Sequence, residues 1–411
     1  MAAPHAGLKV LEFGNAMAGP YCGMMLADYG AEVIKVERMG VGDDSRMWAP
    51  FFHGAVAAYF ASANRNKKSI AVDIKTREGV DLIRRLAADA DVLIDNYRLG
   101  ALERAGLGYD DLSAINPRLI YASISGFGAS GPLRHRAAND LFMQAYSGGM
   151  SITGYPDGDP VKMGLSVCDI GAGMMATMGI QMALMVRMQT GRGQRVDTSL
   201  LEGQVSMLSY HITRWFASNE VPKAAGSGGL GNATYRAYEA SDGWLVIACF
   251  NERLWRDLCR ALDREEWLED PRFKSSSLRT EHKEALVALL ETVFATRPTA
   301  EWLERMLARN VPCSPINTID RMVAEEQVAA RDLIVGFDLE GLGPMQMGGL
   351  PIKFSETPGA LRSAPPRLGQ HTAEVLGGLG IPSSEIDSLA AKGVIGLDHG
   401  WALPGTPAAA E

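Results

Sequence analysis

Asp169 is the residue whose setting most favours chemistry. It directly precedes residues 170–186, a run without a charged side chain. A carboxylate beside a buried segment costs free energy unless it is hydrogen-bonded or used in a reaction. Helix N-caps also favour Asp, because its oxygens accept the free N–H groups of the first turn. The local sequence therefore leaves two interpretations open, a helix cap and a nucleophile or base.

Phosphate binding is the second chemistry that the sequence suggests. The turn at 14–20 lies where dinucleotide-binding folds place their phosphate loop, and Glu37 ends the next strand as a ribose-binding acid would. The glycine spacing is not GxGxxG, which disfavours NAD. Arg38 suggests a phosphate contact, because a guanidinium grips phosphate oxygens in a fork. Four more basic residues either line the path of a phosphate-bearing ligand or simply solvate the surface: Arg65, Lys67, Lys68 and Lys75.

Composition narrows the class of partner. The chain has 411 residues, a net charge of -8 and no long basic cluster, which argues against a nucleic-acid partner. Its five cysteines are scattered without a CxxC pair or a His at metal-ligand spacing, so no structural metal is expected. The isolated histidines also have no nucleophilic Ser or Cys partner in a motif. No secretory signal is expected at the start, and a buried helix explains 170–186 better than a membrane span. We expect a cytoplasmic protein that acts on small molecules.

Alternating strands and helices predict the fold that must position these residues. Apolar runs bounded by turns predict a doubly wound, Rossmann-like α/β domain with a mostly parallel sheet. The predicted strands are 8–13, 33–36, 69–72, 92–94 and 119–125. The predicted helices are 20–29, 77–88, 139–150, 170–190 and 200–216.

A second, smaller α+β domain follows a stretch rich in Gly, Ser and Ala. Residues 235–250 predict two short strands around the turn 241–243. After this domain, a final short helix is predicted to begin at 373. Helices are predicted at 252–262, 283–296 and 299–309. We therefore predict a large domain from 1–223 and 326–411, and a small domain from 224–325. The glycine stretch 226–232 is either a lid over the substrate or a flexible linker.

Taken in order, several stretches resemble the class III CoA-transferase family, the formyl-CoA transferase and CaiB/BaiF group. The resemblance covers nearly the whole chain and is carried by 10–12, 18–20, 26–37, 64–69, 116–121, 126–128, 190–197 and 369–372. It implies an interlocked homodimer in which each chain has a Rossmann-like large domain built from both termini. It also implies an acyl-CoA and a small carboxylic acid as substrates, with no tightly bound cofactor, ATP or metal.

The resemblance assigns roles residue by residue. Asp169 matches the catalytic aspartate, which carries first the acyl group as a mixed anhydride and then CoA as a thioester. The positions that match CoA contacts are Ala18, Arg38, Val72, Lys75, Asn96, Tyr97 and Arg104. The positions that match the substrate pocket are Met17, Trp48, Tyr59, Asp140, Gly228 and Gly229.

Departures from the family pattern bear on specificity. Met17 stands where formyl-CoA transferases carry Gln, and Ala137 and Asn139 replace their Lys and Tyr. A more apolar pocket suits an acyl group with a carbon chain rather than formate or oxalate. Arg46 is a candidate partner for the distal carboxylate of a dicarboxylic acid, or else a surface arginine. Succinyl-CoA and a short dicarboxylic acid are expected by family habit, whereas the sequence leaves the identity of both acids open.

Two other functions compete with CoA transfer. The 2-methylacyl-CoA racemases of the same family need a His near position 139, and Asn139 has no pKa suited to proton transfer. A catalytically idle CoA-binding protein would need Asp169 to act only as a helix cap. The nearby Trp48, Tyr59 and Asp140 argue against this idle function.

Overall fold

The computed structural model describes residues 2–229, 232–398 and 400–401. Contacts within the chain divide it into two units. The first comprises Met1–Gly149, Met163–Ala217 and Ala329–Glu411, and the second comprises Met150–Lys162 and Ser218–Val328. The predicted domain boundaries at 223 and 325 stay a prediction.

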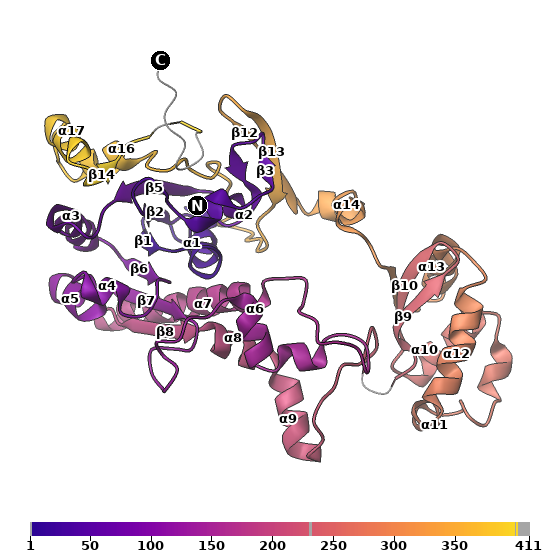
Figure 1. The fold of residues 1–411 in the computed structure, drawn as a ribbon. Helices are drawn as coiled ribbons and strands as arrows, with labels where there is room; N and C mark the ends of the chain where they lie inside the picture. Colours follow the sequence, from indigo (N-terminus) through magenta and orange to yellow (C-terminus); the bar gives the residue numbers. More distant parts are fainter. Residues whose placement is uncertain (1, 230–231, 399, 402–411) are drawn as a thin grey trace. The chain divides into compact units, whose positions relative to one another are not determined.

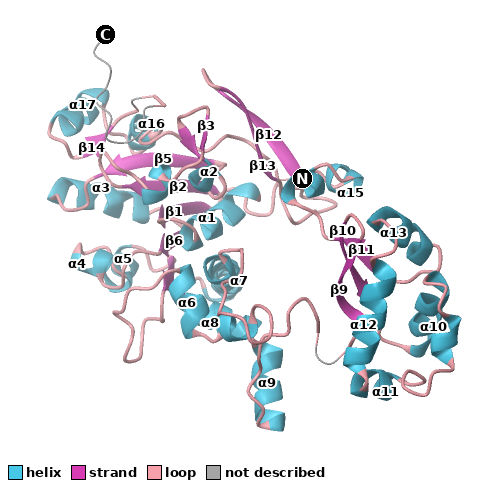
Figure 2. Ribbon diagram, turned by 45° about the vertical axis from the view of Figure 1, so that its right-hand side comes forward, coloured by secondary structure: helices cyan, strands magenta, loops and turns pink. Residues whose placement is uncertain are grey.

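A seven-stranded sheet organises the first unit (Figures 1 and 2). In spatial order its strands are β14 (Ile395–Gly396), β5 (Lys67–Val72), β2 (Glu32–Glu37), β1 (Lys9–Phe13), β6 (Val92–Asp95), β7 (Ile120–Ser125) and β8 (Arg195–Ser199). All neighbours pair in parallel except β14, which runs antiparallel to β5. The predicted α/β fold with a mostly parallel sheet is confirmed. The sequence prediction missed β8 and β14, because β8 alternates polar residues and β14 has two residues.

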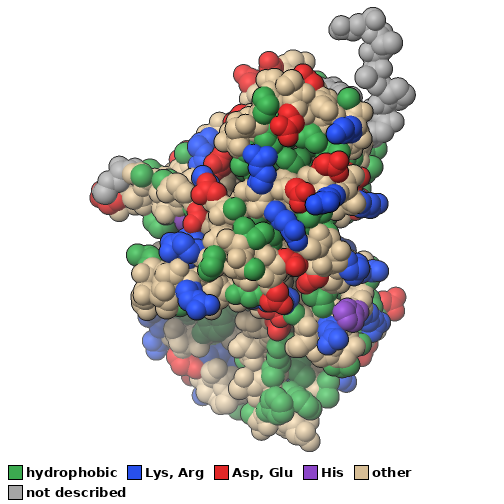
Figure 3. All heavy atoms as spheres, turned by 90° about the vertical axis from the view of Figure 1, so that its left-hand side faces the viewer, with side chains coloured by type: hydrophobic (Ala, Val, Ile, Leu, Met, Phe, Trp, Pro, Cys, Tyr) green, Lys and Arg blue, Asp and Glu red, His purple; other side chains and the backbone are tan. Residues whose placement is uncertain are grey.

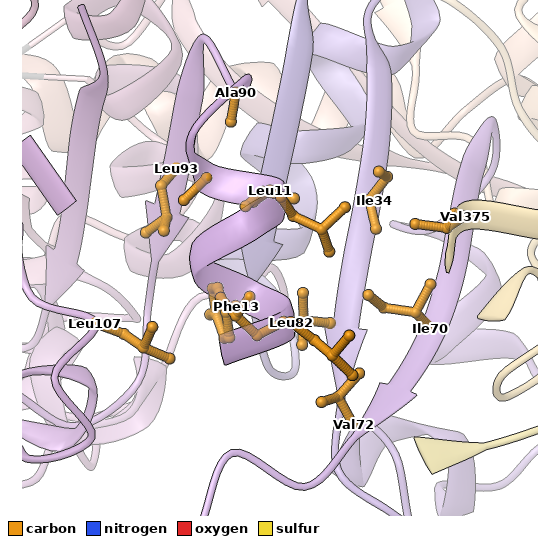
Figure 4. Packing of buried hydrophobic residues seen from close by; sticks show 14 of the residues in the cluster. Leu11, Phe13, Ile34, Ile70, Val72, Leu82, Ala90, Leu93, Leu107 and Val375 are labelled. Atoms are coloured by element: carbon orange, nitrogen blue, oxygen red, sulfur yellow. The ribbon is translucent and has the colours of Figure 1, made fainter. Parts of the chain in front are cut away.

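Both faces of the sheet are buried, which explains the continuous apolar runs of its strands. Successive side chains point to opposite faces. On one face Leu11, Phe13 and Ile34 pack with Leu82 and Val375, which come from helices far apart in the sequence (Figure 4). On the other face the core includes residues of α1 (Ala18–Asp28) and α7 (Val167–Thr190). These two layers of helices hold the carboxyl ends of the strands in place.

The helices of the first unit differ from prediction at several places. The predicted helix 139–150 ends early as α6 (Asp140–Tyr146), and 200–216 divides at Leu208 into α8 (Leu200–Met207) and α9 (Ser209–Ser218). A further helix, α17 (Ser383–Ala391), follows the one predicted to be last. The sequence prediction also missed the short helices α2 (Ala58–Ala61), α4 (Ala101–Arg104) and α5 (Tyr109–Ile115), whereas α3 (Arg77–Ala87) and α16 (Thr372–Gly378) lie where helices were predicted. Two hairpins complete the unit: β3 (Phe51–Phe52) with β4 (Val56–Ala57), and β12 (Ile334–Leu339) with β13 (Gly343–Gly348).

The predicted burial of helix 170–190 is only partly correct. α7 is long and apolar enough to cross a membrane by length and composition alone, yet it packs against α1, α8 and β7. Its opposite side exposes a row of methionines: Met174, Met178, Met182, Met185 and Met188. The sequence prediction failed here because an apolar run does not show which of its sides has a partner.

The second unit is built around an antiparallel sheet in the order β11 (Cys313–Pro315), β10 (Gly243–Ala248) and β9 (Tyr235–Ala240) (Figure 2). β9 and β10 flank Ser241 and Asp242, as the turn predicted. Its longer helices are α10 (Glu252–Ala261), α11 (Ser276–Glu281), α12 (Lys283–Phe294) and α13 (Thr299–Leu307), and the shorter α14 (Ile319–Val323) and α15 (Glu326–Ala330) follow. Trp255, Phe294 and Trp302 fill its core.

Candidate active site

Asp169 lies in the first turn of α7, three residues beyond the N-cap position, which is occupied by Ser166. The capping interpretation is therefore wrong, because the helix begins earlier than the sequence predicted. Within the described part of the chain, no hydrogen bond or ion pair engages the Asp169 carboxylate. A partly buried carboxylate without a hydrogen-bonding partner is costly, which marks it as a functional group.

Burial raises the pKa of Asp169 to about 7, and the negative charge of Asp140 adds to the shift. Asp140 is held firmly: its Oδ1 accepts from the backbone N–H of Cys168 at 2.8 Å, and its Oδ2 accepts from Gln144 Nε2 at 2.6 Å. The Gln144 amide also donates to the carbonyl of Leu165 at 3.1 Å. The start of α6 therefore fixes the chain on either side of Ser166 and places a second carboxylate near Asp169.

Asp169 lines a cavity of about 260 Å³ at the carboxyl ends of the strands, together with Met17, Ala18, Asn96 and Tyr97. These residues come from the loops after β1 and β6, where open α/β sheets bind their ligands. Five residues that the sequence assigned to catalysis, substrate and CoA thus share one cavity.

Trp48 and Tyr59 form an aromatic pair beside Asp169. Their rings meet edge to face with centroids 4.9 Å apart. Burial raises the pKa of the Tyr59 phenol, and the charge of Asp169 raises it further. The Ser166 hydroxyl partly offsets this rise in the pKa. The predicted neighbours Trp48, Tyr59 and Asp140 are therefore gathered around Asp169.

A second cavity, of about 1050 Å³, is rich in basic side chains. Five predicted CoA residues line it: Arg38, Val72, Lys75, Tyr97 and Arg104. Arg77 and Arg84 add positive charge, against the acids Asp73 and Asp81. Forked guanidinium groups suit phosphates. Because Tyr97 lines both cavities, the basic cavity adjoins the one that contains Asp169.

The basic cavity is a local concentration of charge. On the face that carries α3, α5 and α17, Lys and Arg side chains lie interspersed with Asp and Glu (Figure 3). Arg38 itself lies next to Asp44 and donates to the carbonyl of Gly42 at 3.0 Å. Its guanidinium is thereby held at the edge of the cavity.

The glycines predicted to contact substrate belong to the second unit. The N–H of Gly228 donates to the Ala225 carbonyl at 3.3 Å, and that of Gly229 donates to the Tyr235 carbonyl at 3.0 Å. A Cβ on Gly229 would lie 2.4 Å from the Tyr235 ring, so this position requires glycine. Residues 230 and 231 of the predicted lid lie outside the described residues.

Two ligand contacts that the sequence left open, a distal carboxylate on Arg46 and the disfavoured ribose on Glu37, are excluded because these two side chains pair with each other. Arg46 is buried and donates to Glu37 through Nε at 2.8 Å and through Nη2 at 2.7 Å. Glu37 also accepts from the Ser69 hydroxyl at 2.6 Å, which leaves no place for a ribose. Arg46 is therefore not free for the distal carboxylate of a substrate.

Two residues of the predicted phosphate path are also buried. Arg65 pairs with Asp28 at 2.7 Å, and Lys67 pairs with Glu12 at 2.7 Å. Lys68 lies away from the basic cavity, paired with Glu32 at 2.6 Å. Only Lys75 of the four predicted residues lines that cavity.

A buried network that the sequence analysis missed supports the loop after β1. Asp43 pairs with Lys35 at 2.9 Å and accepts from the backbone N–H of Ala16 at 3.0 Å. Lys35 also pairs with Glu12 at 2.9 Å, and all three charged residues are buried. Burial opposes the ionised form of Asp43, but Lys35 and Ser45 hold its pKa below the usual range. Charged residues inside apolar strands were the signal that could have found this network.

Ala16 shows what the network does. Its φ of 62° lies in the left-handed region, which is unfavourable for alanine. The hydrogen bond to Asp43 holds this conformation, while Asn15 donates from its backbone N–H to Asn96 Oδ1 at 2.8 Å. The wall of the Asp169 cavity between Asn15 and Ala18 is thus fixed from behind.

Asn139 caps a helix and does not take part in proton transfer. Its side chain accepts from the N–H of Phe142 at 2.9 Å and so caps α6. An amide used as a cap supplies no proton for racemisation. Over the described ranges, no cluster of three or more His, Cys, Asp or Glu side chains could hold a metal ion.

Comparison with known proteins agrees with this geometry. The family model "CoA-transferase family III" matches residues 6–372. The succinyl-CoA:glutarate CoA-transferase of Mus musculus is 38% identical over 393 residues, which cover 95% of this chain and 90% of the relative. The succinate–glutarate CoA-transferase of Agrobacterium fabrum is 38% identical over 384 residues, with 91% and 95% coverage. The crystal structure of a CaiB/BaiF family protein from Brucella suis superposes with a TM-score of 0.84 at 39% identity, over 92% of this chain and 100% of that one. The chain belongs to CoA-transferase family III and is a CoA-transferase.

Proposed function

We propose that the enzyme moves CoA from succinyl-CoA to a short dicarboxylic acid through covalent intermediates on Asp169. The observation that carries the proposal is the unbonded Asp169 carboxylate in a cavity that adjoins a basic one. The names of the mouse and Agrobacterium relatives support dicarboxylic acids as substrates. CoA enters as part of a substrate, and no tightly bound cofactor takes part.

In the first half-reaction an oxygen of Asp169 attacks the thioester carbon of the donor. The carbon–sulfur bond breaks, and the products are a mixed anhydride and CoA thiolate. The thiolate then attacks the carbonyl carbon of Asp169 and releases succinate, leaving an aspartyl-CoA thioester. Each step conserves an activated acyl bond, so the exchange consumes no ATP.

In the second half-reaction the acceptor carboxylate attacks the aspartyl thioester and displaces CoA thiolate. The thiolate attacks the acyl carbon of the acceptor in the new anhydride, which forms the product thioester and restores Asp169. Both intermediates are lost if water reaches them. We assign the exclusion of water to Trp48 and Tyr59. The backbone N–H groups at the start of α1, beginning with Ala18, would stabilise the oxyanions.

We assign the polar and charged parts of CoA to the basic cavity. Arg38, Lys75 and Arg104 would hold its phosphates, and Val72 would lie against the adenine. Tyr97, which lines both cavities, and Asn96, which lines the cavity of Asp169, would guide the pantetheine arm toward Asp169. Met17 would face the carbon chain of the acyl group.

A cytoplasmic, interlocked homodimer completes the proposal. The exposed methionines of α7 form a row with the spacing of one helix face, and Met182 and Met185 are 64% and 63% exposed. Apolar side chains gathered on one face mark an interaction surface. A second copy of the chain would cover them, and sedimentation analysis at several concentrations would measure the dimer.

The covalent mechanism is tested with hydroxylamine. Enzyme preincubated with succinyl-CoA should lose activity on addition of hydroxylamine and carry a hydroxamate at Asp169 by mass analysis. Enzyme without acyl-CoA should be unaffected. The Asp169→Ala variant should keep the far-ultraviolet spectrum and oligomeric state of the wild type but transfer no CoA. Appreciable turnover by this variant would disprove the role of Asp169, and α-deuteration of an acyl-CoA in D2O would instead indicate racemisation.

A further inference from the structure

A dicarboxylic substrate has a second carboxylate that the chemistry at Asp169 leaves untouched. A carboxylate taken out of water needs a cation or several donors to replace its hydration. Arg46, the candidate from sequence, is paired with Glu37 and is excluded. The cavity that contains Asp169 must therefore be searched for another cation.

Besides Arg98, which directly follows Tyr97, three consecutive basic residues line that cavity: Arg134, His135 and Arg136. They lie between β7 and α6, on the segment that leads to Asp140. We propose that Arg136 binds the distal carboxylate of the dicarboxylic substrate and that Arg134 adds positive charge beside it. The inference rests on the proposed function and names the residue that selects a diacid over a monoacid.

Arg136 is unpaired but oriented. Across the described residues, no carboxylate forms an ion pair with it. Its guanidinium instead stacks over the ring of Phe142, 4.6 Å from the centroid. Phe142 in turn contacts Phe127 and Tyr146, with both pairs of centroids 6.1 Å apart. Stacking on an aromatic cluster leaves the donors at the edge of the guanidinium available for a forked pair with a carboxylate.

The same helix fixes the spacing between Arg136 and Asp169. Phe142 belongs to α6, whose first residue, Asp140, accepts from the N–H of Cys168 next to Asp169. The positions of the Arg136 guanidinium and of Asp169 therefore both depend on contacts with α6. A dicarboxylic acid bound at both ends would be selected by its chain length as well as by its charge.

The other basic residues are better suited to bind the phosphates of CoA or to orient a neighbouring side chain. Arg98 directly follows Tyr97, the residue that both cavities share, and Arg38, Lys75 and Arg104 line the second cavity. That cavity is larger and suits the phosphates of CoA. Arg134 donates from Nε to His135 Nε2 at 3.0 Å, so His135 acts as an acceptor and orients Arg134 rather than the substrate. The two anionic parts of the donor thus have separate basic sites.

The test compares acids and donors that differ only at the distal end. Glutarate and valerate serve as acceptors, and succinyl-CoA and butyryl-CoA serve as donors, with wild type, Arg136→Met and Arg136→Lys. Arg136→Met should lower kcat/KM for glutarate and succinyl-CoA by roughly 100-fold or more, and leave valerate and butyryl-CoA within about twofold. Arg136→Lys should recover part of the loss, because the charge returns without the fork.

Arg118→Met is the matched control, since Arg118 is an exposed arginine that contacts the carbonyl of Gly191 and lines neither cavity. It should leave the ratio of diacid to monoacid unchanged, and thermal melts should show that all variants fold. Equal losses for glutarate and valerate, or for both donors, would overturn the inference and assign Arg136 to CoA. A wild-type enzyme that transfers CoA to valerate but not to glutarate would instead disprove the dicarboxylic substrate itself.

Discussion

Asp140 accepts a hydrogen bond from the backbone N–H of Cys168 at 2.8 Å, one residue before Asp169. This bond couples α6 to the start of α7 and keeps two carboxylates close together. Their repulsion, added to burial, raises the pKa of Asp169 to about 7. The nucleophile therefore changes its charge near neutral pH.

This shift predicts a pH profile. Asp169 must be ionised to attack, so kcat/KM should rise with pH through about 7. Asp140→Asn keeps an oxygen that can accept from Cys168 but removes the negative charge, which lowers the pKa of Asp169. The rising limb should therefore move to lower pH. A profile measured from pH 5 to 9 whose midpoint is the same in both enzymes would refute this electrostatic coupling.

Asp43→Asn tests the support of the loop after β1. The variant weakens the pairing with Lys35 and the bond that holds Ala16 in its left-handed conformation. A displacement of about 1 Å in a catalytic wall costs roughly 100-fold in rate, so kcat should fall by that order while KM changes little. Glu32→Gln, which removes a partner of the half-buried Lys68, is the control and should leave kcat unchanged. A large rise in KM with normal kcat would contradict a positioning role.

Arg104→Ala tests the basic cavity. Loss of a hydrogen-bonded cation should raise KM for acyl-CoA by roughly 10- to 100-fold with little change in kcat. If Arg104 binds the 3′-phosphate of CoA, removal of that phosphate should not affect the variant. Thioesters of CoA and of dephospho-CoA should then give similar KM values with Arg104→Ala. Arg85→Ala on α3 is the control, because Arg85 bonds the carbonyl of Leu379 and does not line the cavity. Equal KM changes in both variants would argue against a specific contact.

Gly23→Ala tests the buried charges. A Cβ at this position would lie 1.9 Å from Glu12 Oε2 and would force the carboxylate away from Lys67. Breaking a buried ion pair is strongly destabilising, by about 3–5 kcal/mol, so urea unfolding should show a much lower midpoint. Gly377→Ala in α16 has open space around it and should stabilise by about 0.5–1 kcal/mol. Equal stability of Gly23→Ala and wild type would show that the network can rearrange.

The sequence predicted the parallel sheet because each buried strand is a short apolar run followed by a helix. It did not predict the ion network, since pairing depends on strand register. Glu12 and Lys35 lie 23 positions apart but face each other as β1 and β2 pair. Arg46 was misassigned for the same reason: nothing near it in sequence reveals that it meets Glu37 in the interior.

The sequence predicted which residues belong to the candidate site, but not how they are arranged in space. Matching stretches assigned Asp169, Asn96 and Tyr97, and the structure gathers them in one cavity. The helix boundary was the weak point, because Ser166 and Asp169 are both good caps and only the fold decides between them. Arg136 escaped attention because an exposed arginine in a loop has no distinguishing pattern.

The edge of the large sheet has a consequence for how the protein is made. β14, at residues 395–396, covers the outer side of β5, whose partner on the other side is β2. A ribosome synthesises residues 1–394 before this strand exists, so the backbone groups of β5 stay open to wrong partners during translation. The second unit, drawn mainly from 218–328, is complete well before that point. Truncation just before residue 395 should therefore yield chains that aggregate through β5 rather than a smaller soluble enzyme.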